Sequence, residues 1–209
     1  MFKKVALALA VVLGVLILVV ATRPSTFRVE RSLTMAATAE LPFGVVNDFH
    51  QWHHWSPWDA LDPKMEKSFS GAYAGPGGVY SWSGNDQVGK GKMTNLEAKP
   101  YESIRIQLEF LEPWPSTATT TFLFEPAPEG VTVRWVMEGE NDFMGKAMSL
   151  LMDMDAMIGR DFEKGLASMK ALVEPEHAKR LEMKARREAA EAEEQEAPAP
   201  PAQADAPTP

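Results

Sequence analysis

The first 25 residues carry an uninterrupted apolar run. Val5–Ala21 contains no charged residue, and Lys3 and Lys4 precede it. A helix that crosses a bilayer needs about 20 mostly apolar residues, with about 17 as the short limit. The pattern therefore predicts a membrane-spanning helix within residues 1–25.

A cleaved signal peptide is the alternative interpretation of this segment. Val19 and Ala21 would then occupy the −3 and −1 positions of the cleavage site, although the apolar region of a signal peptide usually has only about 7–15 residues. An uncleaved helix has two lysines before it and only Arg23 close after it. The positive-inside rule then places the domain on the non-cytoplasmic side of a single-pass protein. Cleavage would instead release a secreted domain.

Residues 26–138 follow mainly the two-residue period of strands. The predicted strands are Thr26–Met35, Lys64–Ser70, Val79–Ser83, Val88–Ala98, Tyr101–Phe110, Thr117–Phe124 and Val131–Glu138. In the first strand the expected inward positions are Phe27, Val29, Met35 and either Ser32 or Leu33. Short turns separate the strands, so they should form an antiparallel meander, with a tight hairpin turn at Gly84–Asp86.

A short helix is expected between the first two strands. Thr38 is its candidate N-cap, and Pro57 marks the end of the helical segment because the residue before a proline disfavours helical backbone. The segment between them includes three tryptophans, Trp52, Trp55 and Trp58.

From Asn141 to Val173 the apolar residues recur at steps of three or four. The stripe consists of Phe143, Ala147, Leu151, Met154, Ile158, Phe162, Leu166 and Met169. This period predicts one long amphipathic helix, with Asn141 or Asp142 as its N-cap, that packs on the sheet. Residues 175–209 read as a charged and then Pro/Ala-rich tail, a solvated helix to about Glu196 and disordered beyond it.

Composition narrows the classes of function. The 209-residue chain has a formal net charge of −8 and no basic cluster interleaved with aromatics, so nucleic acid is not expected as a partner. It has no cysteine, which excludes disulfides, thiolate metal sites and a cysteine nucleophile. The length between the apolar segment and the tail suits one domain, residues 26–174.

Several stretches resemble those of one superfamily. They are VERSLTM at Val29–Met35, the W-x-x-WSPW run from Trp52 to Trp58 followed by Asp62-Pro63, YSWSGN at Tyr80–Asn85, VGKGKM at Val88–Met93 and DFEKGL at Asp161–Leu166. Over residues 26–174 the chain resembles the START-like (SRPBCC) superfamily, in its polyketide cyclase/dehydrase and lipid-transport group and a membrane-anchored subgroup. The resemblance implies an α+β helix-grip fold. In this fold a curved antiparallel sheet wraps around the long C-terminal helix, here preceded by the transmembrane helix.

Nine apolar residues are candidates for lining a cavity between sheet and helix. They are Trp55, Trp58, Trp82, Phe110, Phe122, Trp135, Met137, Met154 and Ile158. The alternative is that these side chains simply fill the core, and clustered tryptophans usually anchor a fold through their large buried area. Pocket size and filling are not visible in a sequence, so both interpretations stay open.

Polar residues give a weaker signal. His50 is spaced from His53 and His54 as metal ligands on a helix are, but no cysteine or placed carboxylate completes a set, so neither a metal nor a cofactor is expected. Ser56 has no G-x-S-x-G context.

Three functions follow from these observations. The first is a membrane-anchored module that binds an apolar small molecule or lipid in the sheet–helix cavity. The second is a polyketide cyclase/dehydratase-like enzyme, which would need a positioned acid or base. The third is a non-catalytic protein-interaction domain. No inward pair of His, Asp or Glu is evident, so the sequence favours a role without catalysis.

Overall fold

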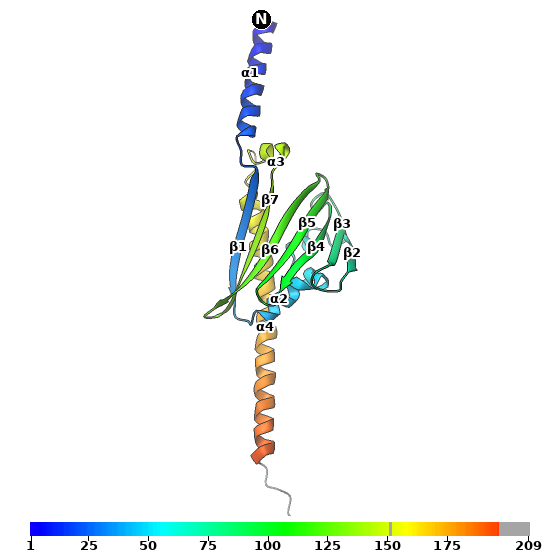
Figure 1. Ribbon diagram of the computed structural model, residues 1–209, viewed down its shortest axis with the longest axis vertical. Coiled ribbons are helices and arrows are strands. Elements are labelled where there is room, and N and C mark those ends of the chain that lie inside the picture. Colours follow the sequence, from blue (N-terminus) through cyan, green and yellow to red (C-terminus); the bar gives the residue numbers. More distant parts are fainter. Residues whose placement is uncertain (151, 197–209) are drawn as a thin grey trace, which may run out of the picture.

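The computed structural model describes residues 1–150 and 152–196, so the Pro/Ala-rich end of the predicted tail lies outside the described residues. The helical elements are α1 (Phe2–Ala21), α2 (Glu40–Asn47), the 3-10 helices η1 (Phe49–His54) and η2 (Pro57–Ala60), α3 (Phe143–Met148) and α4 (Met154–Glu196). The strands are β1 (Thr26–Met35), β2 (Glu66–Gly71), β3 (Gly78–Ser83), β4 (Lys90–Lys99), β5 (Ser103–Glu112), β6 (Ser116–Ala127) and β7 (Gly130–Glu140). Figure 1 shows α1 at one end of the molecule and the second half of α4 at the other.

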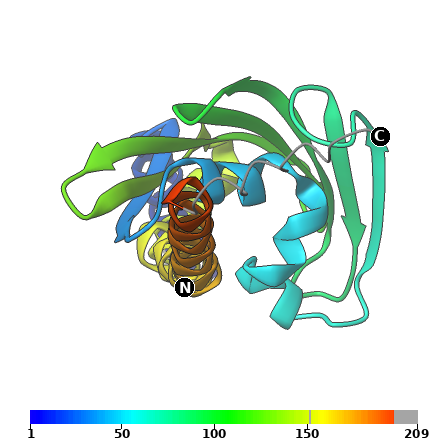
Figure 2. The same cartoon turned by 90° about the horizontal axis from the view of Figure 1, so that it is seen from below.

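The seven strands form one antiparallel sheet in the order β1-β7-β6-β5-β4-β3-β2. Consecutive strands from β2 to β7 are neighbours, and β1 closes the edge beside β7. The sheet curves around α4, α2, η1 and η2, as the view along the long axis shows (Figure 2). This arrangement confirms the predicted helix-grip fold.

The core joins the middle of α4 to the concave face of the sheet. The Trp135 ring on β7 stacks on the Phe162 ring of α4, with ring centroids 4.0 Å apart and planes at 4°. Phe122, Trp55 and Trp58 pack around Trp135 with centroid distances of 4.8, 5.5 and 5.7 Å. Such aromatic contacts add about 0.5–1.5 kcal/mol each beyond area burial, so this cluster joins β7 firmly to α4.

The inward residues of β1 differ in part from the prediction. Val29 pairs with Met137 and Leu33 with Val133, so Leu33 and not Ser32 faces the core. Arg31 also points inward, beside Trp135. Its guanidinium spans to α4 and reaches Glu163 at 2.8 Å and Asp155 at 3.1 Å. These carboxylates raise the pKa of Arg31 and keep it charged at the edge of the core.

The prediction of one helix from 141 to 173 was wrong, because the chain breaks between α3 and α4. Asp142 caps α3 by accepting the Gly145 N–H at 2.7 Å, and Asp153 accepts the Ala156 N–H at 3.0 Å where α4 begins. The apolar period suggested a single helix, but two polar N-caps begin two separate helices within it. The deep stripe contains only Phe162, Leu166, Met169 and Val173, which are buried, whereas Phe143 is exposed.

Two local predictions also need correction. Ala39, not Thr38, precedes α2, and it makes no side-chain cap. The β3–β4 connection is not a tight turn at Gly84–Asp86 but a six-residue loop closed by a hydrogen bond from Gly84 N–H to Gly89 O at 2.9 Å. The solvated helix predicted to end at about Glu196 is present as the continuation of α4 through Pro175.

We predict that Phe162→Ala lowers the free energy of unfolding by about 3–5 kcal/mol, because it removes the ring that Trp135 stacks on and leaves a cavity. Phe143→Ala is the matched control, since the same truncation at an exposed ring should change stability by less than about 0.5 kcal/mol. Urea unfolding of both full-length variants, followed by tryptophan fluorescence, measures the difference. Equal losses of stability would contradict the finding that the helical part of the core comes from α4 and not from α3.

Candidate functional site

The concave face of the sheet is closed at one end and open at the other. Strand register places inward residues in rows, and the row of Ile104, Phe122 and Trp135 is buried. The rows nearest α1 contain Trp82, Phe110 and Leu108, whose side chains are only half-buried. The concave face therefore keeps accessible apolar surface at the end that carries α1.

Glycine makes room for the bulkiest of these side chains. Trp82 pairs with Gly91, and a Cβ on Gly91 would lie only 2.4 Å from the Trp82 ring. Trp82 in turn contacts Phe110 edge-on, with ring centroids 6.1 Å apart. Its indole N–H donates to Val88 O at 3.0 Å, so the ring is held in place and presents its apolar body to the concave side.

The three clustered tryptophans divide between core and opening. Trp52 and Trp55 are buried, and their indole N–H groups donate to Val46 O and Val45 O at 2.9 and 3.2 Å. These bonds attach η1 to α2, which agrees with an anchoring role. Trp58 is half-buried and contacts both Trp135 and Phe162.

The nine candidate cavity residues fall into three groups. Four are buried in the core, namely Trp55, Phe122, Trp135 and Met137. Four are half-buried at or near the open end, namely Trp58, Trp82, Phe110 and Ile158. Met154 is exposed at the first turn of α4. The first group fills space between sheet and helix, and the second keeps part of its apolar surface accessible.

An ion pair that the sequence did not predict lies beside the open end. Lys67 on β2 pairs in register with Trp82, and its ammonium contacts the carboxylate of Asp59 in η2. Both side chains are partly shielded, and burial lowers the pKa of Lys67. The sequence could not predict that Lys67 lies beside the core, because β2 has no alternating apolar face and all six of its residues are exposed.

The other polar groups of the interior are only partly engaged with the protein. Thr120 accepts from the Trp135 indole at 2.8 Å and donates to Val136 O at 2.9 Å. Asn95 donates to the Asn47 side chain at 3.2 Å, but its own Oδ1 is buried without a hydrogen-bond partner among the described residues. Tyr80 is buried, and this burial raises the pKa of its phenol to about 12. Apart from the Lys67–Asp59 pair and the Tyr80 phenol, the surroundings of Trp82 are mainly apolar.

The histidines do not form a ligand set. The His50 Nδ1–H donates to Asp48 Oδ1 at 2.8 Å, and the His50 ring stacks on the rings of Phe69 and Tyr73. His53 turns back to His50 O at 2.7 Å. Within residues 1–150 and 152–196, no three His, Asp or Glu side chains converge as metal ligands do.

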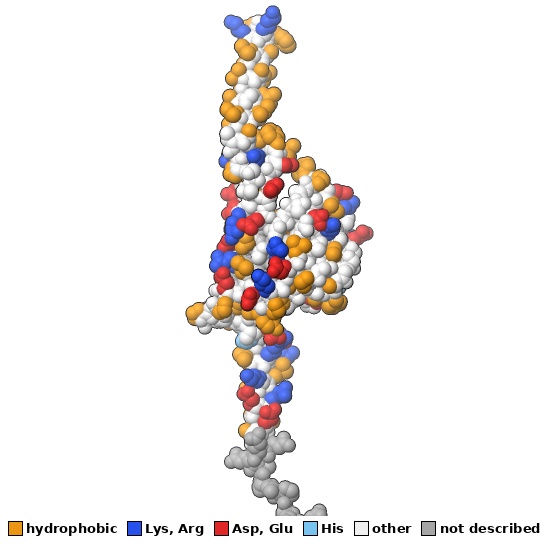
Figure 3. All heavy atoms as spheres, in the orientation of Figure 1, with side chains coloured by type: hydrophobic (Ala, Val, Ile, Leu, Met, Phe, Trp, Pro, Cys, Tyr) orange, Lys and Arg blue, Asp and Glu red, His pale blue; other side chains and the backbone are white. Residues whose placement is uncertain are grey.

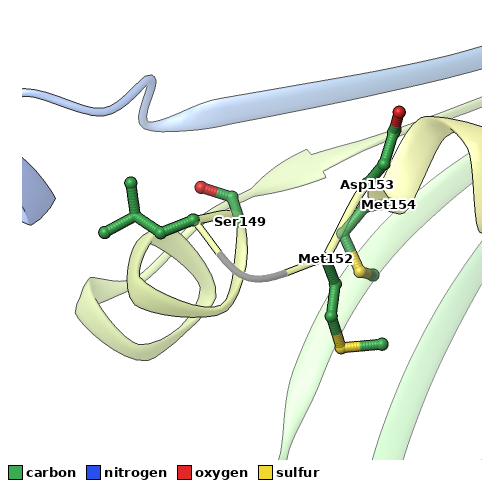
Figure 4. Close-up of a pocket in the computed structure, with 5 residues that line it drawn as sticks. Ser149, Met152, Asp153 and Met154 are labelled. Carbon is green, nitrogen blue, oxygen red and sulfur yellow. The ribbon is translucent and has the colours of Figure 1, made fainter.

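Among the concavities on the surface of the described residues, two lie at opposite ends of the domain. One of about 470 Å³ lies at the α3–α4 junction and is lined by Ser149, Leu150, Met152, Asp153 and Met154. Figure 4 shows Met152 and Met154 on one side of the connecting chain and Asp153 on the other. The second, of about 440 Å³, lies at the opposite end between α2 and α4, where Leu41, Leu172 and Arg180 contribute to its walls. Of the predicted cavity residues, only Met154 lines either one.

Helix α1 is long and apolar enough to cross a membrane or to serve as a signal sequence. Its 20 residues are almost entirely exposed to the surroundings of the protein, and apolar side chains cover it (Figure 3). The domain surface carries mixed charge instead. On the convex face, Arg134 reaches Glu30 at 2.6 Å and Glu125 at 2.8 Å, and these pairs raise the pKa of Arg134.

Comparison with known proteins agrees with this fold class. The chain belongs to the family described as polyketide cyclase / dehydrase and lipid transport, which matches residues 26–174. This family fold supports a ligand-binding module. No match was found among curated proteins.

Solved structures are similar in fold at low sequence identity. Protein CV1439 from Chromobacterium violaceum is 22% identical with a TM-score of 0.51, over 73% of this chain and 99% of its own. The Aha1 dimer from Colwellia psychrerythraea is 15% identical with a TM-score of 0.52, over 71% of this chain and 96% of its own. The di-domain ARO/CYC StfQ of the steffimycin biosynthetic pathway is 12% identical with a TM-score of 0.53, over 74% of this chain and 52% of its own.

The buried phenol of Tyr80 predicts a pH effect on stability. Its pKa is about 12 in the fold, against an ordinary value of about 10 in the unfolded chain. The neutral phenol therefore contributes its full stabilisation below about pH 10, and this contribution declines by at most about 1.4 kcal/mol per pH unit up to about pH 12. We expect Tyr80→Phe to gain stability relative to the unmodified protein above about pH 10 in urea unfolding. A difference that is constant across this pH range would contradict the burial of the phenol.

Proposed function

We propose that this chain is a membrane-anchored binding module for an apolar small molecule or lipid. The observation that carries the proposal is the half-buried apolar surface at the α1 end of the concave face, formed by Trp58, Trp82, Leu108, Phe110 and Ile158. Ligand sites are concave and mostly apolar, with few polar groups for orientation. The Lys67–Asp59 pair beside Trp82 supplies such groups.

Desolvation drives binding in this proposal. An apolar ligand that leaves water for this surface gains roughly 25 cal/mol for each Å² of apolar area buried. A half-buried tryptophan gains in the same way, because the ligand covers its exposed part. The gain does not require a specific headgroup, which suits a ligand defined mainly by its apolar body.

Attachment by α1 complements such a ligand. With 20 residues at 1.5 Å each, α1 is about 30 Å long, which equals the hydrocarbon thickness of a typical bilayer. A tethered domain meets membrane-dissolved ligands at a raised local concentration. The domain stands on the non-cytoplasmic side, because the lysines at positions 3 and 4 stay in the cytoplasm.

The apolar lining favours carriage over catalysis. A cyclase or dehydratase needs an acid or base within hydrogen-bond reach of its substrate. Thr120 is held by protein partners, and Asn95, whose Oδ1 has no partner among the described residues, lies in the row of Ile106 and away from Trp82. The polar groups beside Trp82 are the Lys67–Asp59 pair and the Tyr80 phenol. One ion pair at the edge suits orientation of a polar headgroup. The interaction-domain alternative gains no comparable observation.

Photochemical labelling tests the site. We expect a fatty acid that carries a diazirine, added to membranes with the full-length protein, to label Trp82 on β3 and Phe110 on β5 as well as α1. Leu108→Trp should abolish the labelling of these two inward residues, because the larger ring fills the open row, and should leave the labelling of α1 unchanged. Mass spectrometry of the cross-linked peptides measures both.

Leu96→Trp is the matched control for this experiment. Leu96 is an exposed leucine on the neighbouring strand β4, so the same enlargement there should preserve the labelling of β3 and β5. Labelling confined to α1 in the unmodified protein would contradict the ligand site. Far-UV circular dichroism checks that both variants fold.

Membrane attachment is tested separately. We expect the protein purified from its membrane fraction to retain its N-terminus and its full mass of 23.1 kDa, and to resist extraction by alkaline carbonate. Cleavage after Ala21 would instead yield a shorter protein in the soluble fraction, as a signal peptide requires. Intact-mass spectrometry of both fractions distinguishes the two.

A further inference from the structure

An apolar surface surrounds the open end of the domain on two sides. The end of β5 exposes Leu111, and the turn that follows exposes Trp114, which is 66% exposed. Across the opening, α3 and the start of α4 expose Phe143, Met144, Met152 and Met154. We call these six residues the rim. Solitary exposed apolar side chains are ordinary on a protein surface, but a group at one end is not.

Topology puts every part of the rim at the α1 end. Strand β1 starts beside α1, and the antiparallel order then brings the end of β7, the start of β6 and the end of β5 to the same edge. Helix α3 follows β7 directly and lies against α1. The Asn141 N–H donates to Ser25 O at 2.8 Å, which fixes the entry of α3 to the exit of α1. Figure 1 shows α3 beneath α1 and the β5–β6 turn facing the same way.

The connection between α1 and the sheet is too short to hold this end away from a bilayer. Four residues, Thr22–Ser25, separate α1 from β1. Even fully extended, the five steps from Ala21 to Thr26 span at most roughly 18 Å. The polar layer of a bilayer is itself about 5–7 Å thick on each side. The rim therefore lies at the level of the headgroups or just above them.

The chemistry of the rim fits the bilayer interface. Tryptophan concentrates at membrane–water boundaries because its ring is apolar and its N–H is polar. The charges nearby are mixed: Asp142 and Asp153 are acidic, Arg23 and Lys146 are basic, and Glu112 is paired with Lys90 at 3.0 Å. The attraction argued from the rim itself is apolar. Apolar side chains cover this end of the molecule in Figure 3, close to α1.

We infer that the rim docks on the surface of the bilayer that α1 spans, so that the open end of the concave face points into the lipid. The inference deepens the proposed function and rests on its membrane attachment. Docking lets an apolar ligand move between bilayer and protein without crossing water. Trp114 anchors one side of the opening, and the residues of α3 and α4 anchor the other.

Single cysteines test the docking cleanly, because the chain has none of its own. Full-length Leu111→Cys and Phe143→Cys variants carry a spin label and are reconstituted in phosphatidylcholine nanodiscs. Leu96→Cys is the control on the side of the sheet, and Leu9→Cys within α1 is the reference for the bilayer interior. Electron paramagnetic resonance measures the collision of each label with a water-soluble nickel complex and with oxygen.

We expect the labels at positions 111 and 143 to lose collision with the nickel complex and to gain collision with oxygen, whereas the label at 96 stays accessible to nickel. Adding Trp114→Glu to the Leu111→Cys variant should restore nickel collision. Tyr73→Glu, an equally drastic change at an exposed ring far from the rim, should not restore it.

Two results would contradict the docking of the rim, and only one of them would also contradict the membrane anchor. If the labels at 111 and 143 meet nickel as freely as the label at 96, while the label at 9 is shielded, the docking fails and the membrane anchor stands. If the label at 9 also meets nickel, the anchor and the docking fail together.

Discussion

The stacking of Trp135 on Phe162 is the contact on which the rest of the structure depends. It joins β7, near the edge of the sheet, to the middle of α4 across the concave face. The rings of Phe122, Trp55 and Trp58 close around the same point. Beyond this cluster, α4 is held by its buried aliphatic residues Leu166, Met169 and Val173 and by the ion pairs of Arg31 with Asp155 and Glu163. The loop that carries the tryptophans is fixed by the same rings, so sheet, helix and loop share one core.

The position of this cluster also explains which end of the concave face keeps accessible apolar surface. It fills the middle of the concave face, and below it the aliphatic residues of the sheet and α4 complete a dry interior. Toward α1, the helix starts only at Met154, and no comparable aromatic ring of α4 reaches the rows of Trp82 and Phe110. The apolar surface at this end stays partly exposed because α4, which packs on the rest of the concave face, does not extend over it. The break between α3 and α4 lies at this same end of the domain.

The sequence predicts those parts of the fold that local period determines. Alternation located all seven strands to within a few residues, and the three-to-four spacing located the buried stripe of α4. It failed where one side chain changes the outcome, as at Asp153, whose cap starts a new helix inside an unbroken apolar period. Arg31 was missed as an inward residue because its charge suggested solvent, although strict alternation from Val29 to Leu33 places it inward.

The candidate site was harder to predict than the fold, for a physical reason. Filled and open positions use the same residue types: Trp135 and Trp82 both lie on inward strand positions, yet only Trp135 has a ring of α4 stacked on it. That difference depends on the distance between elements and not on either residue. The Lys67–Asp59 pair likewise joins residues of β2 and η2 that neither period nor motif relates. The sequence therefore cannot show which of the inward apolar side chains are fully buried and which are only half-buried.

The direction of α4 follows from the same topology and separates two environments. The helix begins at the α1 end and runs away from it for 43 residues, about 65 Å at 1.5 Å per residue. Only its first half packs on the sheet, and its second half carries i,i+4 ion pairs such as Glu182 with Arg186 at 2.6 Å. Pairs of this kind, about 0.3–0.5 kcal/mol each, support a helix that has no apolar partner. One helix thus begins beside the open apolar end and finishes in a fully solvated setting, so the chain presents apolar surface on the side of α1 and charge on the other.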